Sequence, residues 1–246
     1  LETDNLYRND GGKFTKITGD SGVKLYSLSL SVTASDINND GWIDLYISND
    51  FGTPDCLYIN QKDGTFKDEI KNATAHNSFY GMGVDIADFN NDGHVDIIQM
   101  DMVAASNRRS KANMASMNPE LFANIERVGF QYQFMQNTLQ INTGFNYQGI
   151  PIFKDISRLA GVSSTDWSWA PLLADFDHDG YKDLFVSIGT RREINNKDYF
   201  ESLRGEKKHE DSLLIKSLNI PTEPIDNYVF KNNGDLTFSK SNTYWG

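Results

Sequence analysis

Three copies of a nine-residue acidic loop recur in this chain of 246 residues. Each follows the pattern Asp-x-(Asp/Asn)-x-Asp-Gly-x-x-Asp, so carboxylate or amide oxygens stand at positions 1, 3, 5 and 9. Calcium is a hard ion that takes six to eight oxygen ligands, and a loop that turns several carboxylates inward meets that need. Position 7 differs in chemistry from copy to copy, which suits a ligand that offers only its backbone carbonyl. We therefore expect about three Ca²⁺ sites, one in each loop.

The expected metal ligands share these five loop positions. They are Asp36, Asn38, Asp40, Trp42 and Asp44 in the first loop, Asp88, Asn90, Asp92, His94 and Asp96 in the second, and Asp175, Asp177, Asp179, Tyr181 and Asp183 in the third. The glycine at position 6 permits the sharp turn that brings both halves of the loop onto one ion. Asparagine replaces aspartate at position 3 in the first two loops, which lowers the charge and leaves the geometry intact.

Two other readings of the loops compete with this one. An EF-hand loop begins in the same way but ends in a bidentate glutamate at position 12, between two helices. Position 12 here is Ile47, Gln99 and Val186, and the flanking residues are short β-branched apolar runs typical of strands. A single Asp/Asn/Gly turn often binds no metal at all. Three copies in register favour calcium inside β-hairpins.

A second motif, Leu-Tyr-x-Asn followed by Gly and Phe, recurs in step with the acidic loops. Its copies begin at Leu6, Leu57, Leu139 and Val229, and each predicts a strand, a tight turn and another strand. A third recurring stretch precedes every loop. Together they predict a four-strand unit: strand A, the calcium turn, strand B, then a C to D hairpin. Blades of a β-propeller have this form.

The expected fold is therefore all-β, a β-propeller segment that occupies residues 1–246 as a partial ring of about three and a half four-stranded blades. The segments are a half blade at 1–26, a blade at 27–72, a blade at 73–160 with an insertion at 103–135, and a blade at 161–246 with an insertion at 190–226. Both insertions lie between strands B and C, and we expect them to be helical. Propellers usually close with four to eight blades, so we expect the remaining blades in a larger chain.

Composition limits the partners and the compartment. The formal net charge is -11, and phosphate binding needs a basic surface, so nucleic acid is not an expected partner. Cys56 is the only cysteine, which excludes an intrachain disulfide. No apolar run is long enough to cross a membrane, and no signal peptide stands at Leu1. Because weak oxygen-ligand loops fill readily in extracellular calcium, we expect a secreted or cell-surface protein.

These residues resemble a known family. The phrases Gly83–Gly93 and Leu173–Gly180 are similar to the core of FG-GAP/VCBS repeats, whose propellers carry the calcium turns also found in the integrin α-subunit. The Leu-Tyr-x-Asn strands and Thr165–Trp169 resemble large exported proteins, often from Bacteroidetes, that pair such repeats with an ASPIC/UnbV domain. The resemblance implies a calcium-stabilised propeller, extracellular or attached to a bacterial outer membrane, that serves adhesion or binds carbohydrate or protein.

Calcium in such loops is expected to be mainly structural, although an open coordination position could also bridge to a ligand. In an up-and-down blade both insertions fall on the face opposite the calcium loops, and long loops on a rigid scaffold usually carry function. There we expect a protein or glycan ligand, with Asp166, Trp167, Arg191 and Arg192 as candidate contacts. Aromatics beside a carboxylate can make a sugar platform, and core packing is the alternative. The basic pairs Arg108–Arg109 and Arg191–Arg192 could hold an anionic polymer or simply pair with neighbouring carboxylates.

Catalytic motifs are missing from the sequence. There is no Gly-x-Ser-x-Gly, no His-Glu-x-x-His, no phosphate loop and no Cys/His cluster. Nearly every paired aspartate is accounted for by the calcium loops. We therefore expect a noncatalytic module. The alternative is a carbohydrate-active hydrolase or lyase that uses paired carboxylates on the insertion face.

Overall fold

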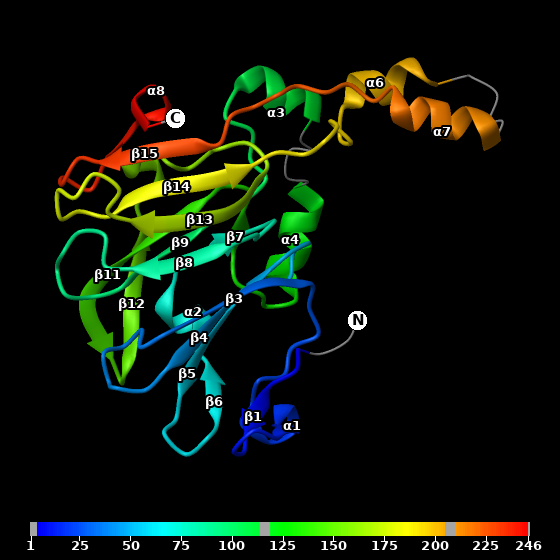
Figure 1. Cartoon of the computed structure of the whole chain (residues 1–246). Coiled ribbons are helices and arrows are strands. Elements are labelled where there is room, and N and C mark those ends of the chain that lie inside the picture. The colour runs from blue at the N-terminus through cyan, green and yellow to red at the C-terminus, as the bar shows by residue number, and fades with distance from the viewer. Residues whose placement is uncertain (1–3, 114–118, 205–209, 246) are drawn as a thin grey trace.

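The computed structural model describes residues 4–113, 119–204 and 210–245, and within them the fold is mostly β (Figure 1). Its main elements are three antiparallel sheets of four strands, and in each sheet the strands follow one another in sequence order. The first sheet contains β3(Ser29–Ser35), β4(Asp44–Asn49), β5(Cys56–Asn60) and β6(Phe66–Asp68); the second contains β8(Val84–Ala87), β9(Asp96–Gln99), β11(Thr138–Tyr147) and β12(Ile150–Asp155); the third contains β13(Ser168–Ala174), β14(Asp183–Ile188), β15(Tyr228–Asn232) and β16(Phe238–Lys240).

The sheets pack against one another through apolar faces. Ile37, Tyr46 and Leu57 of the first sheet form one cluster with Ile97 and Phe153 of the second. A larger cluster joins the second and third sheets, with Phe89, Ile98, Leu139, Leu184 and Phe230 at its centre. Strand β9 is buried along its whole length because it lies between the two clusters, with Ile97 in one of them and Ile98 in the other.

The chain before the first sheet forms a two-stranded antiparallel pair, β1(Tyr7–Asn9) with β2(Phe14–Lys16). Leu6 and Val23, which flank this pair, pack against Ile47, Cys56 and Tyr58 of the first sheet. Every expected four-strand unit and the leading strand pair are therefore observed. No sheet among the described residues closes on itself, so a propeller ring is a proposal, taken up below.

Both insertions join the second and third strands of their sheets. The first contains α3(Asn107–Asn113), α4(Pro119–Arg127) and the short β10(Gln133–Phe134); the second contains α6(Lys197–Ser202) and α7(Glu210–Leu218). In Figure 1 these helices lie at one end of the sheets, and the turns β3–β4, β8–β9 and β13–β14 lie at the other end. Helix α4 packs on the scaffold through Ile125, which is buried, and Phe122, whose ring stacks on Tyr132 at 5.8 Å. The pair Asn118-Pro119 in the sequence favours a helix that begins at Pro119 with Asn118 as its N-cap, and Asn118 lies outside the described residues.

Four short helices and one parallel strand pair were not expected from the sequence. The helices follow the last strand of each unit, and the strand pair joins β7 to the end of the first insertion. They are α1(Thr18–Ser21), α2(Ile70–Ala73), α5(Ser157–Ala160) and α8(Asn242–Trp245), with β7(Asn77–Ser78) beside β10. Elements of two to four residues are too short to show a periodic pattern. Two of them, α1 and α5, end at a left-handed glycine, Gly22 and Gly161, at φ of 78° and 80°, whereas α2 ends at Thr74 in an extended conformation.

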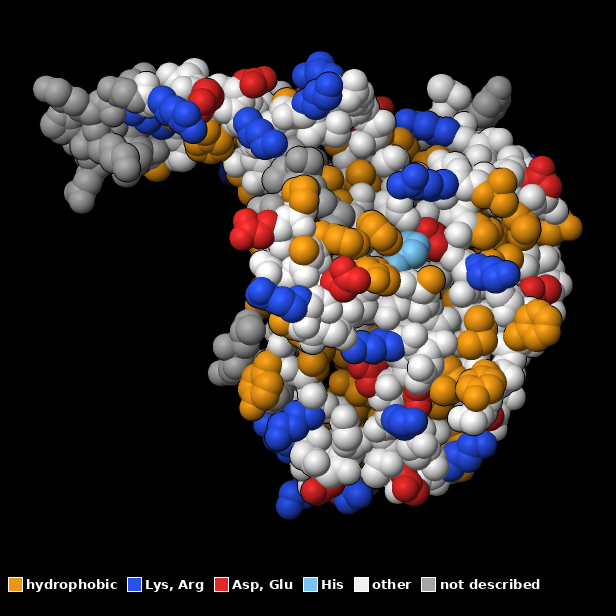
Figure 2. All heavy atoms as spheres, turned by 180° about the vertical axis from the view of Figure 1, so that it is seen from behind, with side chains coloured by type: hydrophobic (Ala, Val, Ile, Leu, Met, Phe, Trp, Pro, Cys, Tyr) orange, Lys and Arg blue, Asp and Glu red, His pale blue; other side chains and the backbone are white. Residues whose placement is uncertain are grey.

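The surface shows no single basic region on the face drawn in Figure 2, where Lys and Arg side chains are dispersed among acidic and apolar ones. The helices in the described part of the chain are all too short or too polar to cross a membrane.

Candidate metal sites and the opposite face

The last aspartate of each acidic loop is the first residue of the second strand of its sheet, and its side chain is fully buried. These residues are Asp44, Asp96 and Asp183. One oxygen of each accepts the amide of loop position 2, at 3.0 Å from Ile37, 3.3 Å from Phe89 and 3.0 Å from Phe176. The other oxygen accepts an amide from the third strand, at 2.8 Å from Asn60, 2.8 Å from Asn142 and 2.9 Å from Asn232. Each loop is thereby closed and tied to the neighbouring hairpin.

The first aspartate of each loop organises the turn. The two oxygens of Asp36 accept the amides of Asp40 at 2.9 Å and Gly41 at 2.8 Å. Asp88 and Asp175 make the same pair of bonds in their own loops. Backbone amides thus hold the first aspartate of every loop in one orientation, and in the third loop Asp175, Asp177 and Asp183 each bring one oxygen within 4.8 Å of the others. Such a constellation can coordinate a hard cation without rebuilding the turn.

The backbone of the three loops is nearly identical. Position 4 has a left-handed conformation in Asn39, Asn91 and His178, with φ between 58° and 62°. Position 6 is glycine, with φ of 87°, 87° and 92°. A Cβ built on these glycines meets no atom within 4 Å, so glycine is needed there for its conformation and not for space. The spacing in the sequence therefore translates into three copies of one turn.

The asparagine of the Leu-Tyr-x-Asn motif has a role that sequence reasoning missed. Its side-chain amide donates to the carbonyl of loop position 8: Asn60 to Ile43 at 3.0 Å, Asn142 to Val95 at 3.4 Å and Asn232 to Lys182 at 2.9 Å. The same residue therefore holds the acidic loop through both its backbone and its side chain. The signal in the sequence is the constant asparagine after each loop, which reveals the repeat but does not reveal the contact.

Successive loops are also bonded to each other. The side-chain amide of Asn39 donates to the carbonyl of Gly93 at 3.1 Å, and that of Asn91 donates to the carbonyl of Gly180 at 2.9 Å. Position 4 of one loop thus contacts position 6 of the next. The three candidate sites form a connected row along one edge of the sheets.

Burial shapes the electrostatics of the sites. Desolvation raises the pKa of Asp96 to about 7. The backbone hydrogen bonds to this carboxylate oppose the rise, and the neighbouring charges of Asp92 and Asp88 add to it. Desolvation also raises the pKa of Asp44 and of Asp183. A divalent cation would favour the ionised form of all three carboxylates. The donor set of buried carboxylates, amide oxygens and a backbone carbonyl fits calcium, and one oxygen from each of Asp175, Asp177 and Asp183 already lies within 4.8 Å of the others.

Two lysines lie beside the loops. Lys62 approaches Asp40 at 3.1 Å, and Lys231 contacts Asp179 at 2.8 Å and also Asp177. Lys231 holds the pKa of Asp179 below its ordinary value. The residues that correspond to Lys231 in the other two sheets are Ile59 and Ile141, so the third loop has a cation that would compete with a metal ion.

On the opposite face Asp166 is held by protein groups. It is 4% exposed, and its two oxygens accept bonds from Arg109 Nε at 2.7 Å and from the Tyr228 hydroxyl at 2.9 Å. Arg109 lies on α3 and also contacts Glu193 and Glu223 of the second insertion. One arginine therefore connects both insertions to the third sheet. Arg108 pairs with Glu223 at 2.5 Å, which agrees with the expectation that some of these basic residues pair with carboxylates.

The other candidate contacts lie nearby. Asp166, Trp167 and Arg191 line one hollow of about 330 Å³ beside this ion-pair cluster. Arg192 is outside that lining, and its guanidinium donates to the carbonyl of Ile220 at 3.1 Å. Trp167 and Trp169 lie with ring centroids 6.0 Å apart, which agrees with side chains on the same side of a strand. The structure thus brings three of the four predicted contacts together, and their role toward a ligand stays a prediction.

Comparison with known proteins confirms the resemblance seen in the sequence. Residues 36–98, which contain the first two acidic loops, match the family model described as FG-GAP-like repeat. The chain is 25% identical over 199 residues to cartilage acidic protein 1 of Mus musculus, which covers 70% of this chain and 31% of that protein. The same protein of Xenopus tropicalis is 35% identical over 86 residues, 34% of this chain and 13% of its own length. The chain spans about a third of the length of the mouse relative.

Proposed function

We propose that this chain, with its FG-GAP-like repeats, is a calcium-binding arc of β-propeller blades in a secreted or cell-surface protein, where it serves as a binding or adhesion module. The observation that carries the proposal is the threefold repetition of one turn, with the same hydrogen bonds to the carboxylates of positions 1 and 9 in every copy. Chance Asp/Gly turns have no reason to bury an aspartate at the same position three times. Calcium gives that burial a cause, because it neutralises the carboxylates.

The role of the ion in this proposal is structural. Each loop connects the first and second strands of a sheet and is bonded to the third strand through Asn60, Asn142 or Asn232. An ion held there would fix three of the four strands relative to one another. Its binding free energy would therefore appear as folding stability.

The proposed arrangement of the sheets is a propeller, with the inner strands β3, β8 and β13 side by side. Support comes from bonds between these strands: the Thr33 hydroxyl donates to the Val84 carbonyl at 3.0 Å, and the Leu173 amide donates to Asp85 at 2.7 Å. The insertions then lie on the face opposite the calcium loops, and we assign protein or glycan binding to that face. The sequence offers no catalytic constellation there, so we propose a noncatalytic module.

Calcium titration of chelator-stripped protein tests the proposal. We expect about three bound ions, and a free energy of unfolding that rises by about 2.7 kcal/mol for each site when free calcium is 100-fold above its Kd. A variant with Asp36→Asn, Asp88→Asn and Asp175→Asn should lose both effects, and magnesium at the same ionic strength controls for screening. Absence of binding, or binding without stabilisation, would reduce the loops to plain turns and remove the argument for an extracellular calcium module.

A further inference from the structure

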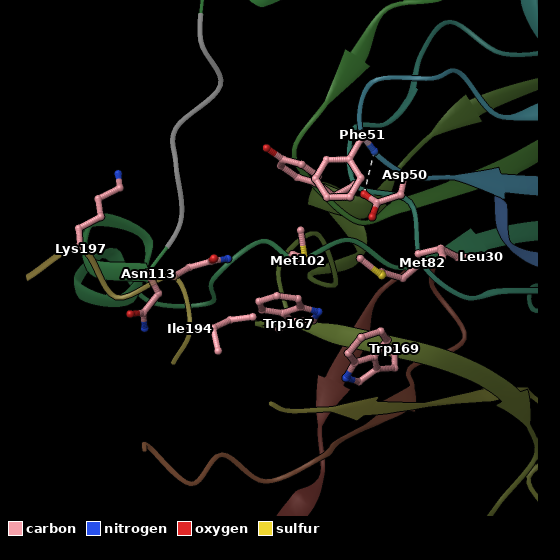
Figure 3. Close-up of a pocket in the computed structure, with 12 residues that line it drawn as sticks. Leu30, Asp50, Phe51, Met82, Met102, Asn113, Trp167, Trp169, Ile194 and Lys197 are labelled. Carbon is pink, nitrogen blue, oxygen red and sulfur yellow. Dashed lines mark hydrogen bonds between the residues drawn. The ribbon is translucent and has the colours of Figure 1, made fainter. Parts of the chain in front are cut away.

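A pocket of about 590 Å³ opens where the inner strands meet the insertions, away from the acidic loops. Figure 3 shows its walls, which come from segments far apart in the chain. They are mainly aromatic and thioether side chains: Phe51, Tyr80, Met82, Met102, Trp167 and Trp169. This volume lies within the range of small-ligand sites, about 300–1,000 Å³.

The aromatic rings present both faces and edges to the pocket. Phe51 and Tyr80 meet edge to face at 5.9 Å, and Trp167 lies 6.0 Å from Trp169. Phe51 is 66% exposed and Trp169 is 46% exposed, so each ring keeps accessible surface for a ligand. An aromatic face attracts a cation within about 6 Å of its centre through the ring quadrupole.

Asp50 is the acidic residue in this wall, and its charge is uncompensated. The residue is 7% exposed, and the bond that its carboxylate accepts within the described chain comes from the amide of Phe51 at 2.8 Å. Burial raises its pKa. The cation of the lining, Lys197, lies on the opposite side of the pocket in Figure 3.

Other buried aspartates near this end of the sheets are fully paired. Asp55 accepts bonds from the Tyr46 hydroxyl, the Asn49 amide and the Asn77 side chain. Asp101 accepts bonds from the Ser78 hydroxyl and from three backbone amides. Asp50 therefore differs from its neighbours, because among the described residues its carboxylate has the Phe51 amide as a donor and no cation, which leaves it able to accept from a ligand.

A second unpaired acceptor lines the same pocket. Asn113 is 7% exposed, and its side-chain nitrogen donates to Glu193 at 2.9 Å, whereas its Oδ1 is buried without a partner in the described structure. Trp167 Nε1 is also buried and unpaired. Buried polar atoms normally have partners, so Asn113 Oδ1 marks a position for a donor group of a ligand, whereas Trp167 Nε1 could only donate to an acceptor.

We infer that this pocket binds an organic ammonium ion, whose N–H groups donate to the Asp50 carboxylate while its alkyl stem packs on the rings of Phe51, Trp167 and Trp169. Asn113 Oδ1 accepts a second donor of the ligand, at the other side of the pocket. A neutral sugar would supply hydroxyl donors but would leave the charge of Asp50 uncompensated. The inference rests on the proposed binding role of the insertion face, and it does not depend on calcium.

Titration of the full chain with pentylammonium, followed by tryptophan fluorescence, tests the inference because Trp167 and Trp169 line the site. We expect saturable binding in calcium-containing buffer at neutral pH. The isosteric neutral alcohol 1-pentanol should bind at least about tenfold more weakly, because it lacks the charge. Asp50→Asn should remove most of this preference, and Asp63→Asn, which changes an exposed turn carboxylate, should leave it unchanged.

Phe51→Ala serves as the second variant, since this exposed ring can be removed without opening the core, and it should weaken pentylammonium binding severalfold. Equal binding of the amine and the alcohol, binding unaffected by Asp50→Asn, tighter binding of methyl glucoside than of pentylammonium, or no saturable binding would each overturn the inference. Thermal unfolding with and without calcium is recorded on the same samples. Calcium stabilisation without pentylammonium binding removes only the pocket assignment, whereas pentylammonium binding without a calcium effect removes only the calcium proposal.

Discussion

Replacing Asp96 by asparagine separates the cost of a buried carboxylate from its use as a metal ligand. Desolvation is the main cause that raises the pKa of Asp96 from 3.8 to about 7, and Asp92 and Asp88 add to it. A shift of roughly 3 pKa units corresponds to at most about 4 kcal/mol for keeping the ionised form folded above pH 7. Asparagine carries no such cost, but it offers one acceptor to the two amides of Phe89 and Asn142. One unpaired buried amide costs about 1–3 kcal/mol.

Without calcium, near pH 8, we therefore expect Asp96→Asn to be about 1–3 kcal/mol more stable than the wild type. Between about pH 4 and pH 7 the folded carboxyl keeps a proton that the unfolded chain has released. The calcium-free wild type thus loses stability as pH rises through this window, and the advantage of asparagine shrinks toward pH 4. With calcium the ionised carboxylate becomes a ligand, and the stabilisation by calcium should be about 2–3 kcal/mol smaller in the variant.

Urea unfolding near pH 5 and near pH 8, in chelator and in saturating calcium, measures all four quantities. Asp68→Asn is the matched control, because Asp68 also accepts two backbone amides, from Leu57 and Ile70, but lies outside the acidic loops. Its effect should not depend on calcium. The reasoning fails if Asp96→Asn is less stable than the wild type in chelator near pH 8, or if both proteins gain the same stability from calcium.

Three further predictions follow from contacts described above. Asn60→Ala removes the bond to the Ile43 carbonyl and should lower the free energy of unfolding by about 1–2 kcal/mol. Urea unfolding measures this loss, and an unchanged midpoint would show that the asparagine of the Leu-Tyr-x-Asn motif does not stabilise the loop. Gly83→Ala places a Cβ 2.4 Å from the Trp169 carbonyl oxygen and should cost about 2–4 kcal/mol, whereas Gly19→Ala, which meets no atom within 4 Å, should cost little. Lys231→Met removes the cation beside Asp177 and Asp179 and should raise the calcium affinity of the third loop about threefold to tenfold. Asp36→Asn and Asp88→Asn disable the other two loops, so competition with a chelating dye then reports the third loop. Unchanged affinity would show that Lys231 does not compete with calcium.

The acidic loops and the strand order could be predicted because both are local. Nine contiguous residues contain every side chain of a candidate site, and the repeat shows which strands flank it. Contacts between distant segments left no such signal. The ion pair of Arg109 with Asp166 joins residues 57 positions apart, and the pocket joins Asp50 to Asn113 and Trp167. Sequence reasoning therefore identified Trp167 by its chemistry but had no way to find Asp50, which lies 117 positions earlier in the chain (167 - 50).

The bonds from Asn39 to Gly93 and from Asn91 to Gly180 give the row of acidic loops a mechanical meaning. Each bond joins one sheet to the next, so it would be stretched if neighbouring sheets moved apart. A force that pulls the sheets apart at this end must break these side-chain hydrogen bonds before the apolar contacts between the sheets open. The opposite rim has a different tether, the ion pairs of Arg109 with Asp166 and Glu193, which are largely buried and therefore only weakly screened by salt. Both rims of the arc are therefore tied, so a force that separates neighbouring sheets must break side-chain links at the acidic loops and at the insertions.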